Sequence, residues 1–244
     1  MKEKDNEMLT DYVVVDLEMT GLSSNRDKII EIGAVKVAGG AVSGEYEMLI
    51  NPNVPLEPKI IEITGITEEM IKDKPYIGDV LQDFFHFVGD STIIGHNLLF
   101  DYSFLMQAAY DNNMKEYADR QWLGIDTLKI ARMCLDKDCS KTLESLGKMF
   151  KIKNENHHRA LNDVLVTKGV YEELCRLYEK DETVFTPEKL HYKPKKDRKP
   201  SKREIRYVEK LISRLGIVPD VDITIMSQSE LSRYANKLIL NQKT

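Results

Sequence analysis

Acidic residues and one histidine lie in three separate segments of the chain, in settings that suit a metal site. The segments are VVVDLEMTGL, GHNLLFD and HHRALNDVLVT, at 13–22, 95–101 and 157–167. Four carboxylates can hold two divalent cations, and an imidazole beside them can take a proton from water. Together such groups could hydrolyse a phosphodiester. The candidate residues are Asp16, Glu18, Asp101, His158 and Asp163.

The first two candidates belong to a predicted strand. Residues 12–17 (YVVVDL) form an apolar, β-branched run of strand length. Because side chains alternate along a strand, Asp16 and Glu18 project from the same face. Neighbouring carboxylates repel each other and are costly to desolvate, and a bound cation removes both problems. The alternative is a strand that ends early and leaves both carboxylates in water.

The other three candidates lie near predicted helix starts. Asp101 follows a predicted strand and the loop GHNLLF. At this predicted helix start, the helix dipole stabilises a carboxylate even without a metal. Asp163 shares helical spacing with the apolar residues that follow it, so we expect an inward-facing side chain that needs a partner. His158 lies five residues before Asp163. This spacing places the imidazole before or at the first turn, as a general-base candidate or as an ordinary surface histidine.

The elements that must position these residues predict an α/β protein. Three strands, at 12–17, at 29–37 and ending near Leu49 and Ile50, form an antiparallel meander. Further strands are predicted at 91–95 and 123–125, and helices at 79–88, 101–113, 127–135, 142–150 and 160–179. This order predicts a mixed central sheet with helices on its faces.

Charge divides the chain into an acidic body and a basic C-terminal part. Residues 186–244 contain 14 Lys+Arg and 7 Asp+Glu, a net charge of +7. The remaining 21 Lys+Arg and 33 Asp+Glu give residues 1–185 a net charge of −12. An acidic body with a basic appendage fits a metal-dependent enzyme that binds a polyanion. The alternative is a solvated charged tail.

The C-terminal part contains a predicted linker and two predicted helices. Residues 193–203 (KPKKDRKPSKR) combine two prolines with many cations and no apolar residue. Capping-box patterns at Ser201-Lys-Arg-Glu204 and Ser227-Gln-Ser-Glu230 each open a helix with an apolar stripe. We therefore expect a body at 1–185, a basic linker at 186–200 and a small helical unit at 201–244. This unit could bind nucleic acid, dock on a partner protein or serve only as a structural tail.

Composition argues against membrane and disulfide-based classes. The first residues contain no apolar signal-peptide core, and no run approaches the ~18 apolar residues of a membrane span. We expect a cytoplasmic protein without a membrane partner. The three cysteines lack zinc-site spacing, and we interpret them as reduced structural thiols.

Three motifs in this order, DLEMTGL, HNLLFD and HRALNDVLVT, resemble the exonuclease motifs of the DnaQ-like DEDD superfamily. The segments EIGAVKV, TGIT and IDTLKIAR extend the resemblance over residues 11–178. In the DEDDh subclass a histidine lies five residues before the last aspartate, which is the position of His158. Arg159 occupies the position of the tyrosine that marks the other subclass.

This resemblance implies a ribonuclease H-like fold and metal-assisted removal of nucleotides from a 3′ end. Asp16, Glu18, Asp101 and Asp163 would ligate two Mg²⁺ or Mn²⁺ ions, and His158 would act as general base. The resemblance also implies contacts with the terminal nucleotide, for which Phe104 has the alternative role of a core residue. The implied contact residues are Met19, Thr20, Gly21, Leu22, Asn97 and Phe104.

The favoured substrate is single-stranded DNA or a frayed 3′ end, as for the proofreading epsilon subunits of bacterial DNA polymerase III. The polymerase alpha subunit is then a candidate partner. An exoribonuclease of the oligoribonuclease or RNase T type is an alternative, because the metals contact the phosphate and readout of the 2′-OH depends on local geometry. A non-catalytic nucleic-acid-binding or polymerase-scaffold protein is an alternative of another class. It would be favoured by loss of a metal ligand, and none is lost here.

Overall fold

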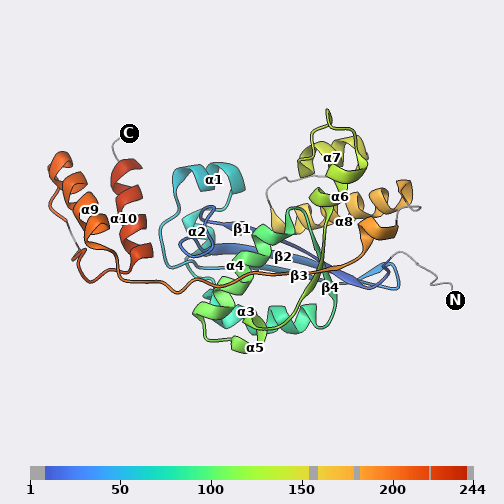
Figure 1. The fold of residues 1–244 in the computed structure, drawn as a ribbon, viewed down its shortest axis with the longest axis horizontal. Coiled ribbons are helices and arrows are strands. Elements are labelled where there is room, and N and C mark those ends of the chain that lie inside the picture. Colours follow the sequence, from blue (N-terminus) through green and yellow to red (C-terminus); the bar gives the residue numbers. More distant parts are fainter. Residues whose placement is uncertain (1–8, 154–158, 179–181, 220, 241–244) are drawn as a thin grey trace.

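The computed structural model describes residues 9–153, 159–178, 182–219 and 221–240 of the 244-residue chain. Its strands are β1 (Tyr12–Met19), β2 (Ile29–Ala38), β3 (Ala41–Leu49), β4 (Thr92–Gly95), β5 (Leu123–Asp126) and β6 (Glu188–Lys189). They form one sheet in the order β3-β2-β1-β4-β5-β6, which lies at the centre of the molecule (Figure 1). β1 is antiparallel to β2 and parallel to β4, so the sheet is mixed as predicted.

The predicted meander forms, and its first strand is longer than the sequence indicated. β1 continues to Met19, and Glu18 pairs with Glu31 of β2. The alternative of a strand that ends before two solvated carboxylates is therefore wrong. Gly39 and Gly40 have φ values of 57° and 78°, which suits the tight turn between β2 and β3.

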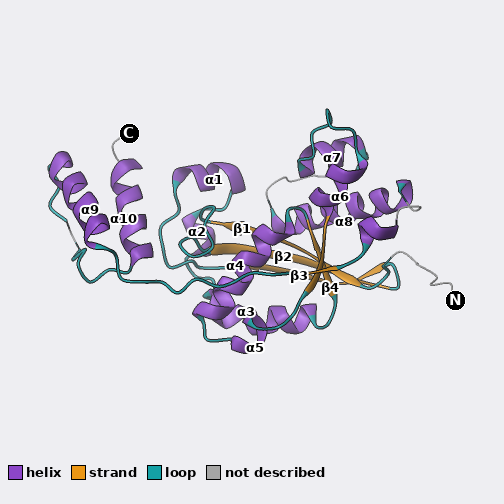
Figure 2. Cartoon of the chain, viewed as in Figure 1, coloured by secondary structure: helices purple, strands orange, loops and turns teal. Residues whose placement is uncertain are grey.

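Helices cover both faces of the sheet, as Figure 2 shows. The helices on or around the sheet are α1 (Pro58–Thr64), α2 (Glu68–Ile71), α3 (Ile77–Val88), α4 (Leu98–Asp111), α5 (Lys115–Ala118), α6 (Thr127–Cys134), α7 (Leu143–Met149) and α8 (Ala160–Leu177). α9 (Lys202–Leu215) and α10 (Gln228–Leu240) lie to one side of the sheet. One core packs β1 residues Val13, Val15 and Leu17 against α3 and α4. The opposite core packs Tyr12 and Val14 against α6, α7 and α8. Alternation then directs the next side chains of that row, at positions 16 and 18, toward α8.

Several short elements and some helix starts differ from the prediction, most of all the start of α4. α4 begins at Leu98, three residues before the predicted start, so Asp101 lies within its first turn. Asn97 caps this helix in the left-handed region, with φ 65°. The elements α1, α5 and β6 were not predicted. β6, with two residues, and α5, with four, are too short to show a repeating pattern of apolar positions.

α9 and α10 pack on each other around a small core of their own, which includes Val208, Leu211 and Leu231. Both predicted capping boxes are present. The hydroxyl of Ser201 accepts from the N–H of Glu204, whose carboxylate accepts from the N–H of Ser201. Ser227 and Glu230 form the same two hydrogen bonds at the start of α10.

The segment between β6 and α9 crosses the body of the molecule, as Figure 1 shows, and contacts α4. The buried side chain of Gln107 on α4 donates to the carbonyl of Lys195 and accepts from its N–H, both at 2.9 Å. At the start of α10, the Ser229 hydroxyl donates to the Asn25 carbonyl at 2.9 Å. Arg26 donates to the hydroxyl of Ser232 at 3.2 Å. The loop after β1 therefore contacts α10 directly.

Candidate active site

Three of the predicted acids converge where β1 passes under the start of α8. Carboxylate oxygens of Asp16, Glu18 and Asp163 lie within 4.8 Å of one another. Asp163 is in the first turn of α8 and is only 9% exposed, in agreement with the inward-facing position predicted from helical spacing. The three groups thus form a compact, oxygen-only set of possible ligands. Hard divalent cations such as Mg²⁺ and Mn²⁺ prefer such ligands.

A glycine on β2 lets α8 approach the sheet this closely. A Cβ atom built on Gly33 would lie 2.4 Å from the carbonyl carbon of Ala160 and 2.5 Å from the nitrogen of Leu161. Real Cβ atoms do not approach other atoms this closely, so any larger residue would push the start of the helix away. Gly33 therefore sets the distance between β2 and the start of α8.

Asp101 approaches the site from α4 and borders the compact group. Its Oδ1 accepts a hydrogen bond from the N–H of Leu17 at 3.1 Å, and its residue is 5% exposed. Leu17 lies between the two acids of β1, so this bond fixes the Asp101 carboxylate at the same point of the strand. The structure therefore brings all four predicted acids to the end of β1, three of them in mutual contact range.

Burial and mutual repulsion raise the pKa values of these carboxylates. Burial raises the pKa of Asp16 well above its ordinary value, and the charges of Asp101 and Glu18 raise it further. Burial, with Asp163 and Glu31, raises the pKa of Glu18 to about 8. Burial raises the pKa of Asp101 to about 7 against the opposing hydrogen bond from Leu17. Raised pKa values favour the protonated forms of these acids, and a divalent cation at the site would compete with the protons.

Two further residues at this site, Glu31 and Arg159, were not selected from the sequence. Glu31 is fully buried on β2, and its carboxylate forms an ion pair with the Arg159 guanidinium at 2.7 Å. A signal for Glu31 was present in IIEIGAVKV (29–37), where it is the one acid of a strand otherwise apolar at its predicted core positions. An acid on a core-facing row needs a buried partner.

The predicted contacts of the terminal nucleotide lie in different settings. Met19 packs in the core, and Thr20 accepts from the N–H of Lys28 through its hydroxyl at 2.9 Å. Gly21 closely faces the Asp27 carboxylate, which a Cβ atom would meet at 2.6 Å. Leu22, in contrast, is 84% exposed at the tip of this loop. Contacts within the loop therefore fix its conformation, and Leu22 is exposed to solvent.

The two contacts predicted on α4 differ as well. The N–H of Asn97 donates to the Asp126 carboxylate at 2.9 Å, which ties the loop before α4 to the start of α6. Phe104 is 2% exposed and packs edge-on against Phe100 in the core, as in its alternative role. His158 lies outside the described residues, directly before Arg159 in the chain.

A mixed sheet whose central strand ends in clustered carboxylates is the arrangement of ribonuclease H-like nucleases. The chain belongs to the exonuclease family RNase T, whose model matches residues 13–171. The predicted family and α/β fold are thereby confirmed.

Curated relatives include DNA polymerases III of the PolC type. That of Bacillus subtilis (strain 168) is 42% identical over 156 residues, and that of Thermotoga maritima is 43% identical over 162 residues. These matches cover 64% and 66% of this chain but only 11% of each polymerase. The shared region is thus a small part of those longer proteins.

Solved structures show the same fold. Exonuclease X in complex with 5′-overhanging duplex DNA aligns with a TM-score of 0.57 and 26% identity, over 72% of this chain and 99% of that one. The Escherichia coli exonuclease I complex with single-stranded DNA, in its zinc-bound form, aligns with a TM-score of 0.63 and 22% identity, over 71% and 42%. Within the described part of this chain, no helix has the length and apolar character to cross a membrane.

Proposed function

We propose that this protein is a metal-dependent 3′→5′ exonuclease that removes nucleoside monophosphates from single-stranded or frayed 3′ ends of DNA. The observation that carries the proposal is the convergence of the Asp16, Glu18 and Asp163 carboxylates within 4.8 Å, in a chain of an exonuclease family. The PolC-type relatives and the exonuclease X complex, both named for DNA, support DNA as the substrate.

The residues present fit two divalent cations, Mg²⁺ or Mn²⁺. Asp16, Glu18 and Asp163 would hold them, with Asp101 completing the set from α4. Bound ions of this kind stabilise the negative charge that develops on phosphate oxygens during in-line displacement. Burial of Asp101 and Asp163 limits the water that would otherwise screen these interactions.

We assign the proton transfer to His158. An unperturbed imidazole has a pKa of ~6.5, so it is largely neutral at physiological pH and can accept the proton of the attacking water. In the sequence, His158 lies five residues before Asp163. This assignment completes the DEDDh set of four acids and one histidine.

We assign the approach of the 3′ end to the loop after β1. Leu22 is the most exposed apolar residue of that loop and suits a wedge against the terminal base. The loop backbone is held by Thr20, Asp27 and Lys28, so Leu22 is presented on a fixed support. A preorganised contact of this kind loses less entropy when the nucleotide binds.

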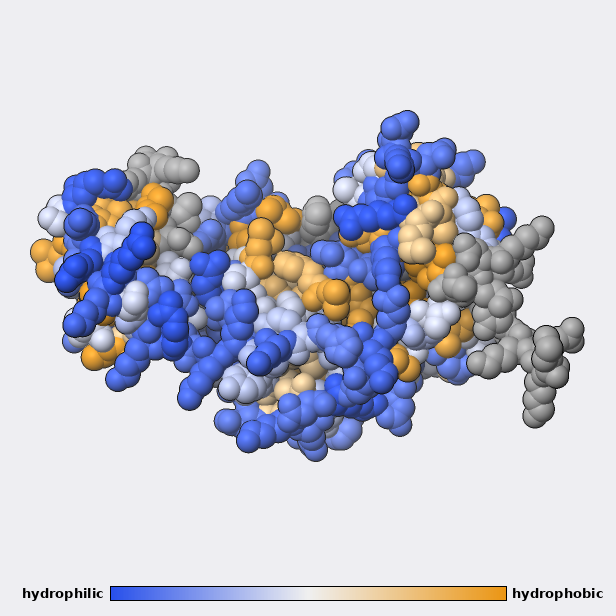
Figure 3. All heavy atoms as spheres, viewed as in Figure 1, coloured by the Kyte–Doolittle hydropathy of each residue, from blue (hydrophilic) through white to orange (hydrophobic). Residues whose placement is uncertain are grey.

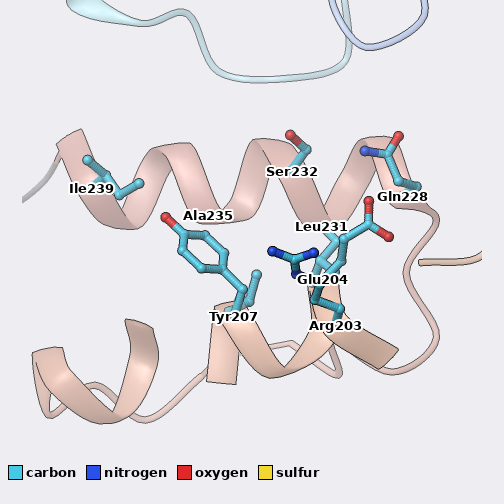
Figure 4. A pocket seen from close by; sticks show the side chains of 9 residues that line it. Arg203, Glu204, Tyr207, Gln228, Leu231, Ser232, Ala235 and Ile239 are labelled. Carbon is cyan, nitrogen blue, oxygen red and sulfur yellow. The ribbon is translucent and has the colours of Figure 1, made fainter. Parts of the chain in front are cut away.

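We further propose that the linker at 186–200 and the C-terminal unit at 201–244 bind the same nucleic acid strand. A groove of about 320 Å³ lies between α9 and α10, lined by Val208, Leu231 and Ala235, and Tyr207 extends across it (Figure 4). Tyr207 is 56% exposed and could stack on a base. The groove also includes Ser232, which contacts Arg26 in the loop next to the site.

Charge supports this second assignment, because cations of the linker could release counterions from a phosphate backbone. Figure 3 shows that hydrophilic residues cover most of this end of the molecule on the face in view. A polymerase alpha-type subunit is the competing partner, because the PolC-type relatives contain the exonuclease segment within a longer polymerase.

The catalytic proposal is tested with 3′-labelled single-stranded DNA and RNA oligomers in Mg²⁺ or Mn²⁺. We expect stepwise shortening of DNA from the 3′ end, and its loss in Asp16→Ala. Glu69→Ala, at an exposed acid of α2, is the matched control and should retain wild-type activity. Equal cleavage by Asp16→Ala contradicts the mechanism, and faster shortening of RNA than of DNA assigns the protein to the exoribonuclease alternative.

The C-terminal proposal is tested by binding of oligodeoxynucleotides without divalent metal at several salt concentrations. Tyr207→Ala should weaken the binding of long oligomers about tenfold, because stacking on one base contributes ~1–3 kcal/mol. Tyr76→Ala, with a similarly exposed tyrosine on the body, is the control. Unchanged affinity in Tyr207→Ala contradicts base binding in the groove and favours a protein partner.

A further inference from the structure

Glu31 is a buried carboxylate at the candidate site that is not among the grouped ligands. Its side chain is 0% exposed, and in the β1–β2 ladder it lies directly opposite Glu18. A carboxylate that is removed from water is costly unless charge and hydrogen bonds compensate it. Among the described residues, the hydrogen bonds that compensate Glu31 come from the start of α8.

Both carboxylate oxygens of Glu31 are used by two consecutive residues. Oε1 accepts from Nε and Nη2 of Arg159 at 3.0 and 2.7 Å. Oε2 accepts from the N–H of Ala160 at 3.0 Å, with a longer contact of 3.3 Å from Arg159 Nε. Ala160 is the first residue of α8, whose early N–H groups have no partner within the helix. One side chain of the sheet therefore caps this helix and binds the residue before it.

The contact continues from the cap to a ligand of the site. The carbonyl of Arg159 accepts from the N–H of Asp163 at 3.1 Å, which closes the first turn of α8. Gly33, two residues beyond Glu31 on β2, sets how near the helix lies to the sheet. Glu31 and Arg159 then determine where along the strand the helix starts and how it is turned.

We propose that Glu31 and Arg159 are positioning residues, which hold the first turn of α8 so that the Asp163 carboxylate meets those of Asp16 and Glu18. The inference rests on the proposed function, because the geometry that the pair maintains is that of the cation site. In the sequence, Arg159 also directly follows His158, the proposed general base.

A purely electrostatic effect of the pair on cation binding predicts other results than positioning of α8. This difference separates the two explanations. Removing the negative charge with Glu31→Gln would weaken cation binding by electrostatics, whereas removing the positive charge with Arg159→Gln would strengthen it. If the pair positions α8, both substitutions weaken cation binding. The double variant Glu31→Gln/Arg159→Gln leaves the net charge unchanged and should still bind cations weakly.

The experiment is calorimetric titration of the 244-residue protein with Mn²⁺, without nucleic acid. We expect affinity about tenfold weaker in Glu31→Gln, in Arg159→Gln and in the double variant, which is the usual effect of losing a partner that orients metal ligands. Arg159→Lys keeps the charge but not the two-pronged contact and should also weaken binding. Glu47→Gln is the control, because its half-exposed carboxylate touches Arg159 only at 3.2 Å.

Tighter or unchanged Mn²⁺ binding in Arg159→Gln would overturn the proposal, and so would wild-type affinity in Arg159→Lys and the double variant. If Glu31→Gln does not fold, the Arg159 variants decide the question, because that side chain is 32% exposed and tolerates replacement better. The titration needs no catalysis. A wild-type protein that binds Mn²⁺ but leaves DNA intact would therefore contradict the proposed function without affecting this test.

Discussion

The end of β1 and the start of α9 treat their carboxylates in opposite ways. At α9, Glu204 accepts from Arg198 and from both the N–H and the hydroxyl of Ser201, which lowers its pKa to about 2. At β1, acids are buried together and raise one another's pKa. A carboxylate whose charge is balanced by nearby hydrogen-bond donors stabilises the fold. Like-charged carboxylates that lie together without a cation form a site that can bind one. The predictions below test this contrast.

The largest expected effect is on catalysis. Asp163→Asn should lower exonuclease activity to less than about a thousandth of wild type, because a neutral amide cannot replace a charged ligand in a two-cation site. The measurement is the initial rate of release from 3′-labelled single-stranded DNA. Glu204→Gln, the equivalent change at α9, should leave that rate within about twofold. Comparable losses in the two variants would erase the contrast.

His158→Gln should reduce kcat about a hundredfold, the usual contribution of a positioned general base. Calorimetric Mn²⁺ binding should remain close to wild type, since the carboxylates are intact. In the wild type, kcat should fall at acid pH, because a protonated imidazole cannot accept a proton from water. A variant that loses Mn²⁺ binding together with kcat would assign His158 to the metal site instead.

Stability should depend on pH in the direction that the buried acids require. The pKa of Glu18 is raised from 4.5 to about 8, and that of Asp101 is also raised. A group with a raised pKa in the folded state stabilises it below the unfolded pKa, and this stabilisation is lost as pH rises through the folded value. The Tm of metal-free protein in EDTA should therefore fall between about pH 4.5 and pH 8.

Excess Mg²⁺ should abolish most of that fall, because the cation replaces the protons. At the upper end of this pH range, where these acids ionise, Asp16→Asn should raise the Tm of the metal-free protein by about 2–4 °C, since it removes one of several repelling charges. A Tm that rises with pH in EDTA would show that the carboxylates are not desolvated in the folded protein, and would contradict this prediction.

The smallest expected effect belongs to the C-terminal unit. Ser201→Ala removes the hydroxyl that accepts from Glu204 N–H and should destabilise α9 by about 1 kcal/mol. Hydrogen exchange of the α9 amides should report this loss while exchange in β1 stays unchanged. Faster exchange in β1 as well would indicate that the two regions unfold as one unit.

The sequence predicted best those features that depend on local patterns. Alternation placed Asp16 and Glu18 on one face, helical spacing turned Asp163 inward, and the serine and glutamate pairs located both C-terminal helices. Such patterns repeat over several residues and therefore stand out. The fold class followed from their order along the chain.

Features that depend on contacts distant in sequence were not predicted. Glu31 and Arg159 are 128 residues apart, and only packing of α8 on β2 brings them together. The two hydrogen bonds between Gln107 and the backbone of Lys195, 88 residues apart, likewise join α4 to a segment interpreted as a linker. Each residue has an ordinary local role, and its partner becomes apparent only in the folded chain.

The most direct test of the cation site is Mn²⁺ titration of the wild-type protein at pH 7 in two buffers that differ in ionisation enthalpy. We predict binding accompanied by proton release, because carboxylates with raised pKa values must ionise as the cation enters. Asp16→Asn should bind weakly in the same experiment. Absence of Mn²⁺ binding by the wild type, or binding without proton release, would contradict the account.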